Sequence, residues 1–235
     1  MNDNYFLPGT DKQLDFLTEN LDITGLSILI IGTGCEEISQ KLLEKGASKV
    51  IIIVDDNDSL LNSRLILSNS GINVKMMEFD NTDFKDSEFD IVYAQASVSN
   101  KKRNKITKEV YRILKAGGNF CVGEITSLTK TPPQFILDLW KNSGVSPLHI
   151  EEQEQYYKGR KFDIVKSENL SYTLKDFYMT SISLLSENID RLTEQEKSYY
   201  KKLLNIISHE SNAYLRLGGD AHIGFYAYIF KKGEL

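Results

Sequence analysis

Residues 27–37, which read SILIIGTGCEE, decide the fold together with the apolar run 50–54 and the acid Asp55 that ends it. A buried strand that ends in Gly-Thr-Gly and leads into an amphipathic helix is a common way for an α/β sheet to present a nucleotide pocket. The glycine turn lets the backbone approach the ligand, and the helix that follows offers unpaired N-terminal amides. The stretch therefore predicts a protein that binds a nucleotide-type cofactor.

The same alternation of strand and helix continues through residue 124. Hydrophobic periodicity predicts strands at 27–31, 49–55, 73–78, 89–94 and 119–124, and helices at 11–21, 35–44, 59–69 and 105–115. Strands that alternate with helices of about ten residues indicate βαβ crossovers and therefore a parallel sheet. This order predicts a doubly wound α/β fold.

The pattern changes after Glu124, where helices dominate. Two further strands, at 161–168 and 222–231, bring the expected total to seven and close a mostly parallel sheet. We expect one domain over 1–235, with an N-terminal helix or cap at 1–24 and a cofactor-binding half at 25–125. The segments 126–160 and 173–217 are expected to form a helical cap or lid over the cleft.

Composition narrows the classes of partner. The net charge of −5 and the pI near 5.4 argue against a nucleic-acid partner, because such proteins generally carry a basic stripe. No run approaches the roughly 18 apolar residues of a membrane-spanning helix, and residues 1–10 lack the pattern of a secretion signal. With two cysteines and no disulfide framework, the sequence predicts a cytoplasmic protein without a membrane partner.

Several motifs, in order and over nearly the whole chain, resemble the class I S-adenosylmethionine-dependent methyltransferases. The run 28–34 sits where that family has its first glycine motif, and Asp55 falls 21 residues after Gly34, where the family has its ribose-binding acid. Asp80-Asn81 matches the family's adenine loop. Residues 87–92 and 109–118 resemble its fourth strand and the passage into its fifth, with Ala116 in place of the usual proline.

The resemblance implies a Rossmann-like methyltransferase fold, S-adenosylmethionine as cofactor, and a role for each matching residue. Gly32, Thr33 and Gly34 would face the methionine part. Asp55 would bind the ribose, with Asp56 beside it or acting as a helix cap, and Asp80-Asn81 would meet the adenine, with a turn acid as the alternative for Asp80. Separately from the resemblance, Gln95 lies just past the fourth strand, at the edge where ligands bind in such sheets, so its backbone is expected to contact the cofactor. No metal is implied.

Two positions depart from the family pattern. Ile30 replaces the acid within the first strand, which in the family helps hold the amino-acid end of the cofactor, and Glu36 replaces the third glycine. A methyltransferase-like binding protein without turnover is therefore an alternative. A nicotinamide-dependent oxidoreductase is a weaker alternative, because a pyrophosphate prefers a G-x-G-x-x-G turn without a nearby carboxylate.

The expected acceptor is an O, N or C nucleophile of a small molecule, bound by parts of the chain that the sheet does not need. Tyr5, Trp140, Tyr178 and His222 are the candidate substrate-binding residues, and His222 is the leading candidate base, although no catalytic residue is assigned. Aromatic side chains would suit an aromatic or amphipathic acceptor. Helix packing, or the face of a homodimer, is the alternative explanation for the aromatic and aliphatic residues of the late helices, such as the stripe Tyr199, Leu203, Ile206, Ile207 and Tyr214.

Overall fold

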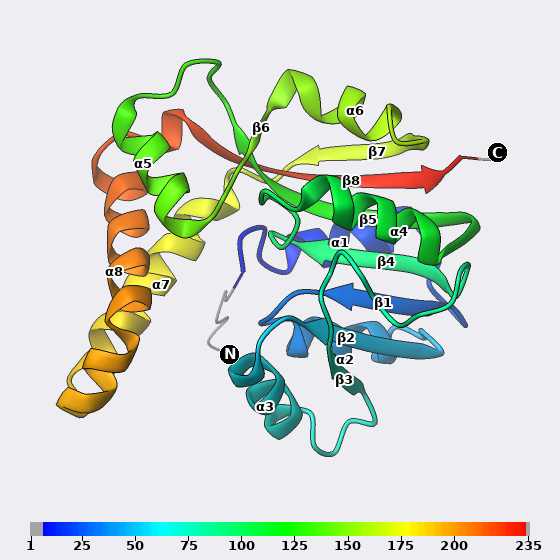
Figure 1. Ribbon diagram of the computed structural model, residues 1–235, viewed down its shortest axis with the longest axis horizontal. Helices are drawn as coiled ribbons and strands as arrows, with labels where there is room; N and C mark the ends of the chain where they lie inside the picture. The colour runs from blue at the N-terminus through cyan, green and yellow to red at the C-terminus, as the bar shows by residue number, and fades with distance from the viewer. Residues whose placement is uncertain (1–6, 234–235) are drawn as a thin grey trace.

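The computed structural model describes residues 7–233 and contains one extended sheet (Figure 1). Its strands follow the order β3-β2-β1-β4-β5-β8-β7, and a short strand β6 pairs with β5 outside this path. The strands are β1 (Ser27–Ile31), β2 (Lys49–Val54), β3 (Asn73–Met76), β4 (Phe89–Gln95), β5 (Leu114–Ser127), β6 (Leu148–His149), β7 (Phe162–Asn169) and β8 (Ile223–Lys232). Because β8 runs antiparallel to both β5 and β7 while the other pairings are parallel, the predicted mostly parallel seven-stranded sheet is confirmed.

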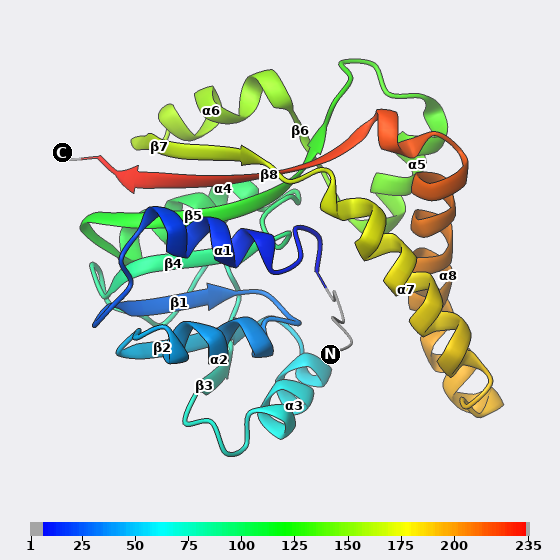
Figure 2. The ribbon, with the colours of Figure 1, turned by 180° about the vertical axis from the view of Figure 1, so that it is seen from behind.

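Helices cover both faces of the sheet. Helices α1 (Lys12–Asn20) and α2 (Glu36–Glu44) lie on the face seen in Figure 2, where Ile28 and Ile30 of β1 point into the core. Helices α4 (Arg103–Ile113) and α6 (Ile150–Lys158) cover the other face, which receives Leu29 and Ile31. Burial on both faces explains why β1 is apolar at successive positions rather than alternating.

A separate group of helices gathers at one end of the sheet, where the parallel strands reach their carboxyl ends (Figures 1 and 2). They are α5 (Gln134–Ser143), α7 (Thr173–Ile189) and α8 (Glu194–Arg216), with a short 3₁₀ turn at Gly219–Ala221 before β8. The rings of Tyr178 on α7 and Tyr214 on α8 pack with centroids 4.7 Å apart. Within residues 7–233, no helix has the length and apolar character that crossing a membrane requires.

Four differences from the sequence-based expectations bear on the site. Strand β3 ends at Met76, two residues earlier than expected, and strand β5 begins at Leu114, five residues before the expected start at 119. Helix α3 (Asn57–Ile66) begins earlier than expected because Asp56 caps it. The pairing of β6 with β5 was not expected, since two residues carry no periodic signal.

Helix α8 is joined to α5 by a partly buried carboxyl group. Glu210 on α8 accepts a hydrogen bond from the Ser143 hydroxyl on α5, and burial raises the pKa of Glu210 above its ordinary value. The folded protein therefore holds this proton at pH values where the unfolded chain has released it.

This raised pKa predicts a pH dependence of stability. The contribution of Glu210 is fully present below the ordinary glutamate pKa of about 4.3 and is lost as pH rises through the higher folded-state value, because the folded state binds more protons there. Urea unfolding between acidic and neutral pH should show this loss in the wild type and a flatter profile in Glu210→Gln. The exposed Glu44→Gln is the control, and identical profiles for all three proteins would contradict the assignment.

Candidate functional site

The glycine turn lies at the carboxyl end of β1. Gly32 and Gly34 have φ angles of +129° and +76°, which side chains rarely adopt, and a Cβ on Gly32 would approach the Ser97 Cβ to 3.0 Å. The Ser97 hydroxyl donates to the Ile31 carbonyl at 2.6 Å, which joins the end of β1 to the loop after β4. Thr33 and Gly34 remain exposed, so the turn presents backbone at this edge.

Asp55 follows β2 at the same edge and lines a cavity of about 270 Å³, which we call the Asp55 cavity. Its carboxylate accepts no hydrogen bond from another described residue, and burial raises its pKa, with further upward contributions from Asp56 and Glu78. The cavity is lined by Asp55, Glu78, Phe79, Asn100, Lys101, Lys102, Ile106 and Gly144. Phe79 and Ile106 supply apolar surface, so the cavity places the Asp55 carboxylate beside apolar walls.

The loop after β3 contributes different residues from those expected. Glu78 and Phe79 line the Asp55 cavity, whereas the Asp80 carboxylate accepts from Lys102 Nζ at 3.1 Å and the Asn81 amide closes a turn onto the Glu78 carbonyl. The reason is the early end of β3, which moves the edge of the sheet two residues back along the chain. An adenine role for Asp80 and Asn81 stays a prediction.

The Asp56 side chain caps the N-terminus of helix α3. Its Oδ1 accepts from the Ser59 amide at 2.8 Å and its Oδ2 from the Ser59 hydroxyl at 2.6 Å, which makes it the N-cap of α3. These bonds lower the pKa of Asp56, in contrast to the raised pKa of its neighbour Asp55. The capping alternative therefore accounts for both carboxylate oxygens of Asp56.

Gln95 holds the N-terminal loop across the end of β4. Its side-chain amide donates to the carbonyls of Pro8 and Thr10 at 2.7 and 2.9 Å, and its carbonyl accepts from the Tyr93 hydroxyl. The buried Gln95 side chain is thus occupied by protein groups, although the backbone contact with a cofactor that the sequence predicts stays untested. Leu7, at the start of the same loop, lies over Gly34.

The two departures from the family pattern lie in protein packing. Ile30 is fully buried and pairs in register with Ile52 and Tyr93, so its side chain does not reach the sheet edge. The Glu36 carboxylate accepts from the Ser63 hydroxyl and so joins α2 to α3. Within the described chain, Glu36 therefore already has a hydroxyl partner.

A buried ion pair positions the segment that precedes α4. Glu124 on β5 is completely buried and accepts from the Ser99 hydroxyl at 2.6 Å, from Arg103 Nε at 3.2 Å and from the Tyr157 hydroxyl. Arg103 also donates to the Ser146 carbonyl at 2.6 Å. These bonds fix both ends of the segment that carries Lys101 and Lys102, and thereby one wall of the Asp55 cavity.

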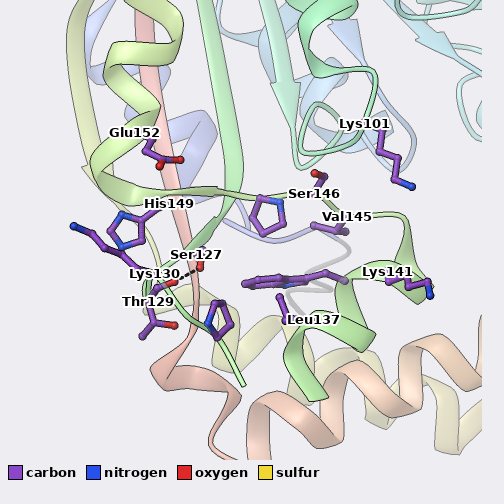
Figure 3. Close-up of a pocket in the computed structure, with 13 residues that line it drawn as sticks. Lys101, Ser127, Thr129, Lys130, Leu137, Lys141, Val145, Ser146, His149 and Glu152 are labelled. Carbon is purple, nitrogen blue, oxygen red and sulfur yellow. Dashed lines mark hydrogen bonds between the residues drawn. The ribbon is translucent and has the colours of Figure 1, made fainter. Parts of the chain in front are cut away.

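A larger cavity of about 560 Å³ lies between α5, β6 and the start of α6 (Figure 3); we call it the Trp140 cavity. Its lining residues are Lys101, Ser127, Thr129, Lys130, Pro132, Leu137, Trp140, Lys141, Val145, Ser146, Pro147, His149 and Glu152. Of the predicted substrate-binding residues, Trp140 lines it. Lys101 belongs to both cavities, so the two adjoin.

The other predicted substrate-binding residues are placed elsewhere. Tyr178 is buried between α7 and α8, as the helix-packing alternative predicts, and lines neither cavity. His222 Nδ1 lies 3.0 Å from the Thr129 hydroxyl, behind the wall of the Trp140 cavity, whereas His149 lies on that wall. Tyr5 falls outside the described residues.

Residues 29–122 match the family model described as a methyltransferase domain. The comparison with curated proteins found no significant match. The matched segment includes the glycine turn, Asp55, the loop after β3 and the Arg103 segment, so it contains most of the Asp55 cavity.

Three solved structures illustrate the likeness in fold. The [4+2]-cyclase SpnF is 16% identical with a TM-score of 0.77, over 95% of this chain and 81% of its own. Phosphoethanolamine N-methyltransferase 2 of Haemonchus contortus, solved with S-adenosylhomocysteine, is 17% identical with a TM-score of 0.80. The match covers 98% of this chain and 55% of the Haemonchus chain. Geranyl diphosphate C-methyltransferase of Streptomyces coelicolor is 12% identical with a TM-score of 0.70. The match covers 95% of this chain and 77% of the Streptomyces chain.

The buried ion pair yields a stability prediction. Glu124→Ala leaves Arg103 buried without its carboxylate and should lower the free energy of unfolding by about 3–5 kcal/mol. Asp86→Ala, which breaks an exposed pair with Arg112, should cost about 0–1 kcal/mol and serves as the control. Urea denaturation measures both, and similar small losses would show that the Glu124 pair does not anchor this segment.

Proposed function

We propose that this chain, in which residues 29–122 match the methyltransferase-domain family model, transfers a methyl group from S-adenosylmethionine to an O, N or C atom of a small molecule. The observation that carries the proposal is the Asp55 carboxylate. Asp55 directly follows β2, and its carboxylate accepts no hydrogen bond from another residue that the structure describes. It faces a cavity whose apolar walls include Phe79 and Ile106. A carboxylate in this position suits vicinal ribose hydroxyls, and apolar walls suit a nucleoside base.

The residues at the sheet edge fit the cofactor. When bound, S-adenosylmethionine supplies a methyl group on a positively charged sulfur. Asp55 would hold the ribose, Glu78 and Phe79 would border the base, and the exposed turn Thr33–Gly34 would face the methionine part. Because the methyl carbon is already activated, the protein's main tasks are to align the acceptor, exclude water and remove a proton where the acceptor carries one.

The similar structures support a small acceptor. Two of them are named as methyltransferases for phosphoethanolamine and geranyl diphosphate, whereas the cyclase shows that this fold also serves another reaction. The fold alone therefore does not identify the reaction. The match to the methyltransferase-domain model and the Asp55 carboxylate, which faces the cavity without a described donor, support methyl transfer. Two buried free cysteines, Cys35 and Cys121, fit a cytoplasmic location, and a homodimer stays a prediction.

Calorimetry with S-adenosylmethionine and with S-adenosylhomocysteine tests the cofactor assignment. Asp55→Ala should weaken binding by about 1.5–3 kcal/mol, the cost of losing hydrogen bonds to a charged group. Asp56→Ala is the matched control: it should lose about 1 kcal/mol of folding stability as a helix cap while keeping its affinity for the cofactor. Unchanged affinity in a folded Asp55→Ala protein would refute the ribose role.

A further inference from the structure

The Trp140 cavity carries positive charge in a protein whose net charge is negative. Three lysines and one glutamate line it, while the whole chain has a formal net charge of −5. Lys130 is paired with Glu151 at 2.7 Å, but Lys101 and Lys141 form no ion pair with any residue that the structure describes. Figure 3 shows these two side chains on the same side of the cavity, opposite Lys130 and His149.

The body of the cavity is apolar. Trp140, Leu137 and Val145 line it together with Pro132 and Pro147, and Trp140 is only 8% exposed. An apolar surface gains nothing from a small hydrated ion, whereas it favours burial of a hydrocarbon or ring. Unpaired ammonium groups beside such a surface therefore select a molecule that has both an apolar body and an anionic group.

The cavity is placed next to the proposed cofactor site. Asn100 forms an isolated β-bridge with Val145, and the Ser146 amide donates to the Ser99 carbonyl at 2.8 Å. The wall between the two cavities is thus the segment that carries Lys101, which lines both. A ligand in the Trp140 cavity would lie beside the cofactor, and about 560 Å³ is an ordinary size for a small-molecule site.

We propose that the Trp140 cavity binds the acceptor and that the acceptor is an amphipathic anion, whose carboxylate or phosphate is held by Lys101 and Lys141 while its apolar part packs on Trp140 and Leu137. The identification of this ligand as the acceptor rests on the proposed methyltransferase function. The selectivity of the cavity for amphipathic anions does not depend on that function.

The chain offers a direct reporter of binding, because Trp140 is its single tryptophan. Octanoate, octyl phosphate and the uncharged octanamide are titrated separately while Trp140 fluorescence is followed. At low salt, at least one of the two anions should bind at least tenfold more tightly than octanamide, and 0.5 M NaCl should reduce that difference. Whichever anion binds more tightly, octanoate or octyl phosphate, identifies the acidic group as carboxylate or phosphate.

Variants then assign the charge selectivity to the two lysines. The double substitution Lys101→Gln with Lys141→Gln should abolish the preference for the anions while leaving octanamide binding unchanged. Lys105→Gln with Lys108→Gln removes two exposed lysines of α4 and should keep the preference. Equal binding of all three probes, no binding of any, or a preference that survives the Lys101 and Lys141 substitutions would overturn the proposal.

The same proteins separate this proposal from the proposed function. Wild type that selects the anions but fails to bind S-adenosylmethionine in calorimetry would refute the methyltransferase function and leave the anion site standing. Wild type that binds S-adenosylmethionine but shows no anion preference would refute the acceptor class alone.

Discussion

The whole arrangement depends on burial of the central parallel strands on both faces. Because β1, β2 and β4 have no exposed face, their side chains are apolar along most of their lengths, and polar chemistry can enter only where the strands end. The parallel pairing makes β1, β2 and β4 end at the same edge, so the glycine turn after β1 and the carboxylate after β2 lie together although they are far apart in the sequence.

Two buried polar anchors shape this edge. Gln95 ties the loop before α1 to the end of β4, and Glu124 ties the segment before α4 to β5 through Ser99 and Arg103. In both cases a buried side chain satisfies groups that would otherwise lose hydrogen bonds to water, which makes each connection costly to break. The loops around the candidate site are therefore held by the sheet itself.

The segment before α4 has a second consequence, since it separates two cavities of different chemical character. One side offers a free carboxylate beside apolar walls, which suits a nucleoside, and the other offers two unpaired lysines beside Trp140. Two substrates that react with one another must lie side by side and still be recognised separately. The free Asp55 carboxylate in one cavity and the unpaired Lys141 with Trp140 in the other provide that distinction.

The sequence by itself determined the strand–helix alternation, the mostly parallel sheet, the glycine turn and the acid that ends the second strand, Asp55, because these follow from local periodicity and turn chemistry. Tertiary structure decided which residues of the later loops reach the site. The end of β3 is set by its pairing with β2, which brings Glu78 and Phe79 to the cavity and leaves Asp80 on Lys102. Tertiary structure also decided that Trp140 lines a cavity while Tyr178 packs between helices. Spacing in the sequence places an aromatic residue on a helix face, but only the neighbouring elements determine what covers that face.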